Sequence, residues 1–572
     1  MERQPKLRSA RWLDADTRMG NLHRQRLKQT GYSEQDFRGK PVIGILNTWS
    51  ELNPCHMHFR ERAEDVKRGV WQAGGFPVEI PVASLGEPFM KPTTALYRNL
   101  LAIEVEEMIR CHPIDGAVLL GGCDKTTPAM LMGAISVDVP SIFVPAGPML
   151  RAIWRGRPLG SGTDSVVMHN EMRAGRISKQ EFDAIEEAGA RSAGHCMSMG
   201  TASTMTALAD VLGFTLLGAS SIPAPDSRHA RMASQSGRCI VEAVHNDLRP
   251  SKMLSRSSFH NAVATLMTLG GSTNAVIHLL ALSRRAGLDL TLDDFADASA
   301  KVPVLANIKP VGSHLMEDFF EAGGLPALLS EISDLIDGEA QTITGRSLAE
   351  GLAGAVRIGD DVIRPRSNPV HDVGGLAILK GSLAPEGCVI KRAAADATLF
   401  RHRGPALVFD GLADMQTRLD DESLPVTQDT VLILRNVGPV GGPGMPEWGL
   451  IPIPKKLLAQ GVSDMVRVTD ARMSGTHFGT IVLHVSPEAA VGGPLALIRD
   501  GDIVSLDVEQ RRIDFEVSGE ELERRRAAWR RPEVFHQRGW VKLHQEHVLS
   551  ASVGCDFDFL ERGNPSPEPE IS

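Results

Sequence analysis

The sequence predicts an α/β protein in two parts: a parallel-sheet α/β domain with many helices over residues 1–365, and a β-barrel-like domain over residues 366–572. Three observations lead to this prediction. At 572 residues the chain exceeds what one hydrophobic core normally organises. Strand-like and helix-like segments alternate in the first third, and short apolar runs separated by turns fill the last third.

The first part begins with apolar runs rich in Val, Ile and Leu, the composition of strands that are buried on both faces. The segments between them place apolar residues at helical spacing, which predicts a parallel sheet covered by helices. Residues 178–340 are expected to be mainly helical. Strands are expected over residues 41–49, 76–85, 114–122 and 139–147.

The boundary is predicted near residues 357–375, where Pro, Gly and charged residues interrupt the periodicity. Short apolar runs with frequent turns follow, and such spacing favours a compact barrel. The expected strand segments are GGLAILKGSLAP, PALVFDG, TVLILRNVGP, MVRVTDARMSG, GTIVLHVSP and IVSLDVEQRRIDFEVS.

Composition excludes several classes of function. The net charge is −9, and basic residues are scattered except at Arg524–Arg526 and Arg530–Arg531, so nucleic acid is not expected as a partner. The N-terminus lacks an apolar signal region, and no uncharged apolar run reaches the roughly 18 residues of a membrane span. The seven cysteines, an odd number, indicate thiols or metal ligands in a cytoplasmic protein.

Reactive side chains follow three of the predicted strands. The carboxyl ends of parallel strands meet at one edge of a sheet, so these side chains are expected to share a crevice. A single cysteine is often only a small buried hydrophobe, but a cysteine followed by Asp and Lys at a strand end favours a ligand role. The residues are Cys55 after the first strand, Glu87 after the second, and Cys123, Asp124 and Lys125 after the third, with Cys196 as a candidate third thiol.

This combination predicts a soft metal centre beside a hard cation. Thiolates favour iron–sulfur clusters, zinc or copper(I), whereas carboxylates favour magnesium or manganese. The cysteine spacing is not a CxxC pattern, so it leaves the kind of metal open.

Three further segments each have two interpretations. The helix start in residues 270–285 could bind a carboxylate or be an ordinary capped terminus. The Gly/Pro-rich loop 438–449 could present Glu447 to a cation or be a flexible turn. Ser474, in DARMSGTHFG, is an ordinary turn residue unless a nearby metal makes it a base.

Several separated motifs occur in the order found in the dihydroxy-acid dehydratase and phosphogluconate dehydratase family, which the chain resembles from about residue 40 to about residue 560. VIGILNTWSELNPC, GVWQAGGFPVEIPV, ARMSGT and LHQEHVLSASVGCDFDFL make it most similar to the sugar-acid (aldonate) dehydratases, such as L-arabinonate and D-xylonate dehydratases. The family motifs are PCHMH, LLGGCDKTTPAMLMGA, GTASTM, GGSTNAVIH, PGMPE, DARMSGT and HVSPEAAVGGPLALI.

This resemblance implies a ligand set and an assembly. Cys55, Cys123 and Cys196 would hold a [2Fe–2S] cluster, with [4Fe–4S] as the alternative, and leave one iron open. Ser474 would be the base, Thr476 would bind substrate, and the protein would be a homodimer or homotetramer. The Mg²⁺ ligands would be Glu87, Asp124, Glu447 and a carbamylated Lys125, although an unmodified Lys125 would neutralise Asp124 instead.

One residue departs from the family pattern. His56 follows the first cysteine where many members carry Asn, which leaves the ligand intact but puts its surroundings in doubt.

The resemblance implies a hydro-lyase that dehydrates a pentonate or hexonate to the 2-keto-3-deoxy acid. The alternatives are the dihydroxy-acid dehydratase of branched-chain amino-acid synthesis, which acts on 2,3-dihydroxyisovalerate, and a non-enzymatic iron–sulfur sensor or structural zinc protein. A sugar acid needs hydrogen-bond partners, for which His544 and His547 are candidates; ordinary core or surface contacts are the other interpretation of these histidines.

Overall fold

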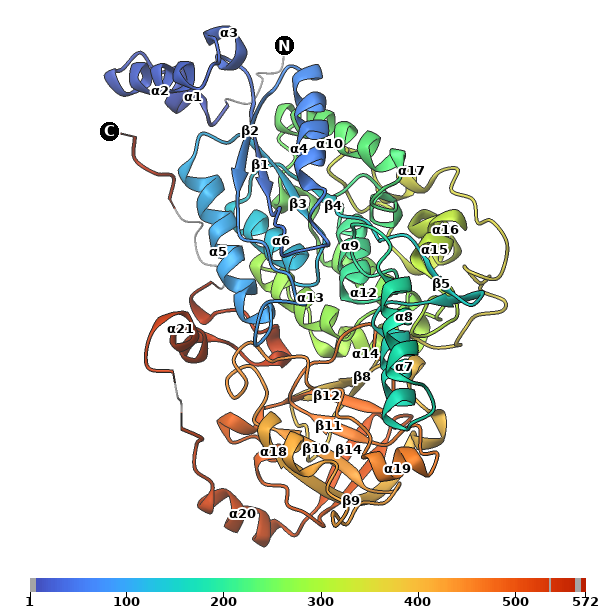
Figure 1. The fold of residues 1–572 in the computed structure, drawn as a ribbon. Helices are drawn as coiled ribbons and strands as arrows, with labels where there is room; N and C mark the ends of the chain where they lie inside the picture. The colour runs from blue at the N-terminus through green and yellow to red at the C-terminus, as the bar shows by residue number, and fades with distance from the viewer. Residues whose placement is uncertain (1–6, 534–535, 561–566, 572) are drawn as a thin grey trace.

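The computed structural model of the protein describes residues 7–533, 536–560 and 567–571. Its N-terminal part contains the predicted parallel sheet, with strand order β2-β1-β3-β4 and all three pairings parallel (Figure 1). Strands β1, β3 and β4 are buried throughout, as the sequence predicts, but β2, at one edge of the sheet, is buried only at Phe76 and Pro77. Their bounds are β1 (Val42–Asn47), β2 (Phe76–Pro81), β3 (Gly116–Gly121) and β4 (Ser141–Pro145).

Helices cover both faces of this sheet. Helices α4 (Phe59–Gln72) and α10 (Ser227–His245) pack together on one face, and α5 (Ala95–Cys111) and α6 (Thr126–Val137) pack together on the other (Figure 1). The α4–α10 contact needs glycine, because a Cβ on Gly69 would lie 1.9 Å from the Ser234 carbonyl oxygen. The two backbones therefore touch directly.

The strand order places a crevice between two of the loops. From β1 the chain passes to β2 on one side, whereas β3 lies on the other side of β1. The loops that leave the carboxyl ends of β1 and β3 therefore diverge, and ligands bind at such switch points in open α/β sheets. These two loops carry Cys55 and Cys123.

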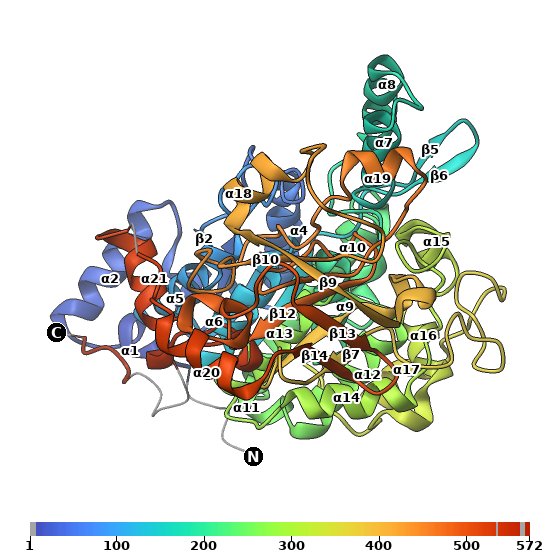
Figure 2. The same cartoon turned by 90° about the horizontal axis from the view of Figure 1, so that it is seen from below.

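The region from residue 178 to residue 340 is mainly helical, as predicted. Two helices, α7 and α8, project from the N-terminal part and run beside the C-terminal part (Figures 1 and 2). The bounds are α7 (Thr163–Arg173), α8 (Lys179–Gly189), α9 (Thr201–Val211), α12 (Arg256–Thr268), α13 (Asn274–Arg285), α14 (Leu292–Lys301), α15 (Met316–Glu321) and α16 (Gly324–Glu331).

The C-terminal part is an eight-stranded sheet in the order β14-β13-β9-β10-β11-β12-β8-β7. The edges meet: Lys380, after β7, donates to the Arg511 carbonyl (3.0 Å) and accepts from Ile513 in β14 (3.1 Å). The sheet is therefore the predicted barrel. Its strands are β7 (Ala377–Leu379), β8 (Gly387–Ile390), β9 (Arg401–Asp410), β10 (Val431–Arg435), β11 (Arg467–Thr469), β12 (Ile481–Ser486), β13 (Ile503–Asp507) and β14 (Arg512–Glu516).

Several elements were not predicted. Strand β8 is only four residues long, too short to show periodicity. The hairpin of β5 (Ala152–Trp154) and β6 (Arg157–Leu159) and the helices α18 (Gly411–Arg418) and α19 (Lys455–Ala459) were missed for the same reason. Among the described residues, no helix is both long enough and apolar enough to cross a bilayer.

Candidate active site

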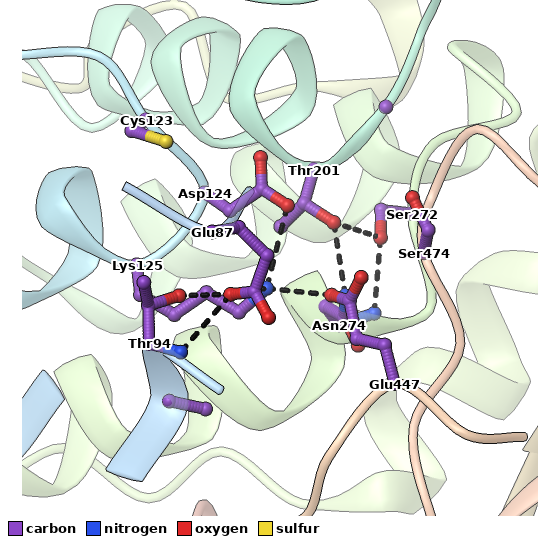
Figure 3. Close-up of polar contacts among 12 residues, drawn as sticks. Glu87, Thr94, Cys123, Asp124, Lys125, Thr201, Ser272, Asn274, Glu447 and Ser474 are labelled. Atoms are coloured by element: carbon purple, nitrogen blue, oxygen red, sulfur yellow. Dashed lines mark hydrogen bonds and ion pairs between the residues drawn. The ribbon is translucent and has the colours of Figure 1, made fainter. Parts of the chain in front are cut away.

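The structure brings together the four residues expected to bind a hard cation (Figure 3). Glu87, Asp124 and Lys125 lie beyond the carboxyl ends of β2 and β3, and Glu447 reaches them from the C-terminal part. The Lys125 amine is fully buried, with its Nζ 2.6 Å from a Glu447 oxygen, 3.3 Å from Asp124 and 3.5 Å from Glu87. Both parts of the protein therefore contribute to one charged cluster.

Electrostatics keep this cluster charged. Burial and Arg472 lower the pKa of Lys125, but Glu447, Glu87 and Asp124 outweigh them, so the pKa lies above its usual value. Burial alone would raise the pKa of Glu447. The positive charges of Lys125 and then Arg472 have the larger effect and lower this pKa to about 2. Burial also raises the pKa of Asp124, and Lys125 only partly offsets this. The carboxylates thus need a cation among them.

In this structure that cation is the lysine itself. Within the described ranges, no three His, Cys, Asp or Glu side chains have the arrangement of a metal site. The Lys125 amine lies among the carboxylates of Glu87, Asp124 and Glu447. The cluster as it stands is a buried ion-pair network.

Arg472, which the sequence analysis did not select, links Glu447 to Glu87 through Thr93. Arg472, almost fully buried, donates from one nitrogen to Glu447 (2.9 Å) and from another to the Thr93 hydroxyl (2.9 Å). Thr93 donates in turn to Glu87 (2.9 Å), which also accepts from the Thr94 amide (3.2 Å) and the Thr94 hydroxyl. Arg472 lies two residues before Ser474 in the DARMSGT motif, the one signal that could have identified it.

The GGSTN segment enters the site through a side chain. Asn274, the first residue of α13, donates from its amide nitrogen to Glu447 (3.2 Å), to the Met473 carbonyl (3.2 Å) and to the Thr201 hydroxyl (2.9 Å) (Figure 3). The Thr201 hydroxyl also bonds Ser272 (2.8 Å). Asn274 therefore connects the carboxylates to the loop of the predicted base.

The predicted cluster thiols also gather in one place. The Cys55 and Cys123 thiols lie close together, and Cys123, burial and the nearby Cys196 raise the pKa of Cys55 well above its usual value. Burial, with a contribution from Asp124, raises the pKa of Cys196 to about 12. The three thiols therefore oppose each other's ionisation. The other cysteines are Cys111 at the surface and Cys239, Cys388 and Cys555 in other contacts.

His56, the departure from the family pattern, joins two of the thiol loops. Its Nε2 accepts from the Cys123 amide (3.0 Å), and its Nδ1 lies 3.1 Å from the Thr48 carbonyl oxygen. Burial lowers the pKa of His56 to about 3, so the ring is neutral at physiological pH. The histidine therefore fixes the backbone of Cys123 relative to the loop of Cys55.

The predicted base lies in a tightly held turn. The Ser474 Oγ is 3.0 Å from the Thr476 hydroxyl and accepts from the Thr476 amide at 3.4 Å. Lys391 donates to the Gly475 carbonyl (3.0 Å), and Thr163 donates to the Thr476 carbonyl (2.6 Å). Glycine is required at 475, because a Cβ there would lie 2.6 Å from the Ser272 hydroxyl oxygen. Ser474 is thus held between the barrel and the helices.

Two buried carboxyl groups hold the loop that presents Glu447. Glu488 accepts from the amides of Val440 (2.8 Å) and Gly441 (2.9 Å), and Asp470 accepts from the Val437 amide (3.1 Å). Burial, and then Asp470, raise the pKa of Glu488 to about 8. The HVSPE and DARMSG motifs therefore also serve to position Glu447.

Replacing Glu488 by Gln is expected to change how stability depends on pH. The unfolded chain loses the Glu488 proton near pH 4.5, whereas the folded chain keeps it to about pH 8, so ionisation costs stability as pH rises through this window. The free energy of unfolding of Glu488→Gln relative to wild type should therefore rise by on the order of 2–4 kcal/mol from pH 5 to pH 8.5. Denaturant melts at both pH values measure this. The exposed Glu520→Gln should show no such trend, and a pH-independent difference for Glu488→Gln contradicts the assignment.

The two histidines considered for hydroxyl recognition make ordinary contacts. His544 is buried and its Nε2 accepts from the Gly444 amide (3.2 Å), so it supports the Glu447 loop. His547 lies at the surface, 3.0 Å from Asp558.

Comparison with known proteins shows which family models match the two parts of the chain. Residues 40–351 match the family model of the dihydroxy-acid/6-phosphogluconate dehydratase N-terminal domain, and residues 361–555 match that of the C-terminal domain. The chain is 56% identical over 568 residues to a 6-deoxy-6-sulfo-D-gluconate dehydratase of Pseudomonas putida, covering 99% of this chain and 98% of the relative.

Other relatives are named either sugar-acid dehydratases or dihydroxy-acid dehydratases. An L-arabinonate dehydratase of Rhizobium leguminosarum bv. trifolii is 47% identical over 563 residues, covering 98% and 97% of the two chains. A dihydroxy-acid dehydratase of Halothermothrix orenii is 39% identical over 548 residues, covering 93% and 97%. With both domain models matched and full-length relatives at this identity, the chain belongs to the dihydroxy-acid/6-phosphogluconate dehydratase family of hydro-lyases.

Proposed function

We propose that this protein dehydrates a sugar acid, a pentonate or hexonate, to the 2-keto-3-deoxy acid, with an iron–sulfur cluster and Mg²⁺ as cofactors. One observation carries the proposal: a largely buried group of thiols lies beside a largely buried group of carboxylates, and Asn274 joins Glu447 to the Met473 carbonyl, next to Ser474. The names of the more similar relatives favour sugar acids over simpler dihydroxy acids.

The thiols fit an iron–sulfur cluster. Cys55, Cys123 and Cys196 converge from separate loops, and their mutual repulsion as thiolates would be relieved by bound iron. Three protein ligands would leave one iron position without a thiolate. The set is compatible with [2Fe–2S] and with [4Fe–4S].

The carboxylates fit Mg²⁺. Glu87, Asp124 and Glu447 are oxygen ligands of the kind this ion prefers, and the space among them already holds a positive charge. Carbamylation of Lys125 would convert the amine at that position into a further oxygen ligand. When bound, the two cofactors would supply Lewis acidity toward the leaving hydroxyl and toward the carboxylate end of the substrate.

The residues of this chain would move the proton. Ser474 would take the proton from C2 of the substrate, because it follows Met473, whose carbonyl is bonded by the same Asn274 amide that bonds Glu447. The Thr476 amide and hydroxyl both lie within hydrogen-bond reach of Ser474 Oγ and would stabilise its deprotonated form. The enol that remains after loss of the 3-hydroxyl becomes the 2-keto-3-deoxy acid.

A substrate panel tests this function. Anaerobically prepared protein is expected to contain iron and acid-labile sulfide and to form 2-keto acid from L-arabinonate, D-xylonate, D-gluconate or 6-deoxy-6-sulfo-D-gluconate. Chelation of Mg²⁺ should abolish the reaction without removing the visible absorption of the cluster. Exclusive use of 2,3-dihydroxyisovalerate would overturn the substrate assignment, and a colourless, zinc-loaded, inactive protein would overturn the enzyme assignment.

A further inference from the structure

A cavity of about 480 Å³ lies between α7 and the C-terminal part, next to the predicted base. Figures 1 and 2 both show α7 running beside α19 at this junction. Gly162 and His477 line the cavity, and His477 donates its backbone amide to the Ser474 carbonyl (3.1 Å). The volume lies in the range of small-molecule sites and exceeds what the reacting end of a small acid requires.

One wall of this cavity is a polar face of α7. Ser165, His169, Asn170 and Arg173 line it at helical spacing, so they project from the same side of the helix. In the described part of the chain, the side chains of Ser165 and Asn170 make no hydrogen bond, and His169 makes only a ring contact with Phe182. Their hydrogen-bonding groups are available to a ligand.

The opposite wall, from the C-terminal part, adds further unused polar groups. Gln416 on α18 lines the cavity, and its side-chain amide has no hydrogen-bond partner among the described residues. The His477 Nδ1 is buried and also lacks a partner within those ranges. Burial lowers the pKa of His477 to about 4, so the ring is neutral and can donate as well as accept.

The charged groups of the lining already have partners. Arg173 donates two hydrogen bonds to Asp420 (2.9 and 3.1 Å), and Arg467 is paired with Asp464. Apolar side chains such as Met415, Leu419 and Ile453 complete the walls. The cavity thus combines an apolar floor with several uncharged hydrogen-bonding groups, which suits a polyhydroxylated chain and not a branched alkyl end.

We infer that this cavity is the subsite for the part of the sugar acid beyond C3, with the polar face of α7 and Gln416 hydrogen-bonding its hydroxyl groups. The inference rests on the proposed function, because it takes the reacting end of the acid to lie at Ser474. Residues Ser165, Asn170 and Gln416 then determine specificity for chain length without touching the reacting atoms. The end group can be a hydroxyl or an acid such as a sulfonate, and the substrates of the test distinguish these.

The test compares long and short acids in near-isosteric variants. Asn170→Leu keeps the branching of the side chain and Gln416→Met keeps its length, and both remove the hydrogen-bonding groups. Each is expected to lower kcat/KM for D-gluconate and L-arabinonate about three- to tenfold, mostly through KM, the size of one or two lost hydrogen bonds. For D-glycerate and 2,3-dihydroxyisovalerate, which lack the distal hydroxyls, the same variants should stay within twofold of wild type. If the protein turns over 6-deoxy-6-sulfo-D-gluconate faster than D-gluconate, the end group is an acid. If it turns over D-gluconate faster, the end group is a hydroxyl.

Glu171→Gln is the matched control, because Glu171 follows Asn170 on α7 but does not line the cavity; it should leave every substrate unchanged. Equal losses on long and short acids, or no loss on either, would overturn the subsite. Wild-type protein that dehydrates none of these acids would overturn the proposed function instead, so the two failures can be told apart.

Discussion

Ser474→Ala is expected to abolish dehydration while leaving the fold and the cofactors intact. Removing a general base typically costs about 10²–10⁴-fold in rate. The side chain is only half-buried and its hydrogen bonds are made with the hydroxyl and the amide of Thr476, so stability should change little. Single-turnover formation of 2-keto acid under anaerobic conditions measures the effect.

Thr476→Val provides the graded comparison. It removes the hydroxyl that lies 3.0 Å from Ser474 Oγ but keeps the Thr476 amide, so a loss of about five- to tenfold is expected. The visible spectrum should match wild type in both variants. If Ser474→Ala retains more than a tenth of the wild-type rate, Ser474 is not the base.

Lys125→Met is expected to remove activity and also to destabilise the protein. It deletes the amine that lies among Glu87, Asp124 and Glu447, and with it the proposed carbamate ligand. Leaving buried charges without their partner costs about 3–5 kcal/mol, and losing the cation site should lower the rate on the order of 10³-fold or more. Denaturant melts and the 2-keto acid assay measure the two effects.

The other fully buried lysine provides the control for stability. Lys391 donates one hydrogen bond, to the Gly475 carbonyl, and burial lowers its pKa to about 7. Lys391→Met should therefore change the free energy of unfolding by about 1 kcal/mol or less. Equal destabilisation by both variants would contradict a charge-specific role of Lys125. In addition, ¹³C-labelled bicarbonate should give a carbamate signal in wild type that is absent from Lys125→Met.

The convergence of the site could be predicted because it follows from sheet topology. Cys55, Glu87 and Cys123 each follow a strand whose apolar run is plain in the sequence, and parallel strands end at one edge. By contrast, only the family resemblance predicted that Glu447 and Ser474 belong to the same site. Nothing in local spacing shows that residues 447 and 474 approach residue 125.

The supporting contacts could not be predicted, because they join residues far apart in the chain. Arg472 bonds Thr93 across 379 positions, and Asn274 bonds Glu447 across 173. A buried arginine and a buried asparagine have no periodic signature. The polar face of α7 does have one, at i, i+4, i+5 and i+8 from Ser165, but only the packed structure shows that this face meets a cavity and not bulk water.

The pairing of Glu447 with Arg472 has a consequence for how the protein assembles during synthesis. A nascent chain that has emerged to residue 351 already carries Glu87, Asp124 and Lys125, one net negative charge, before the barrel exists. The barrel then delivers Glu447 and Arg472 together, 2.9 Å apart, so the total charge of the forming centre does not change. The C-terminal part supplies Arg472 as the counter-ion of Glu447. When the two parts of the protein pack together, the only unbalanced charge in the group Glu87, Asp124, Lys125, Glu447 and Arg472 is therefore the single negative charge of the N-terminal part.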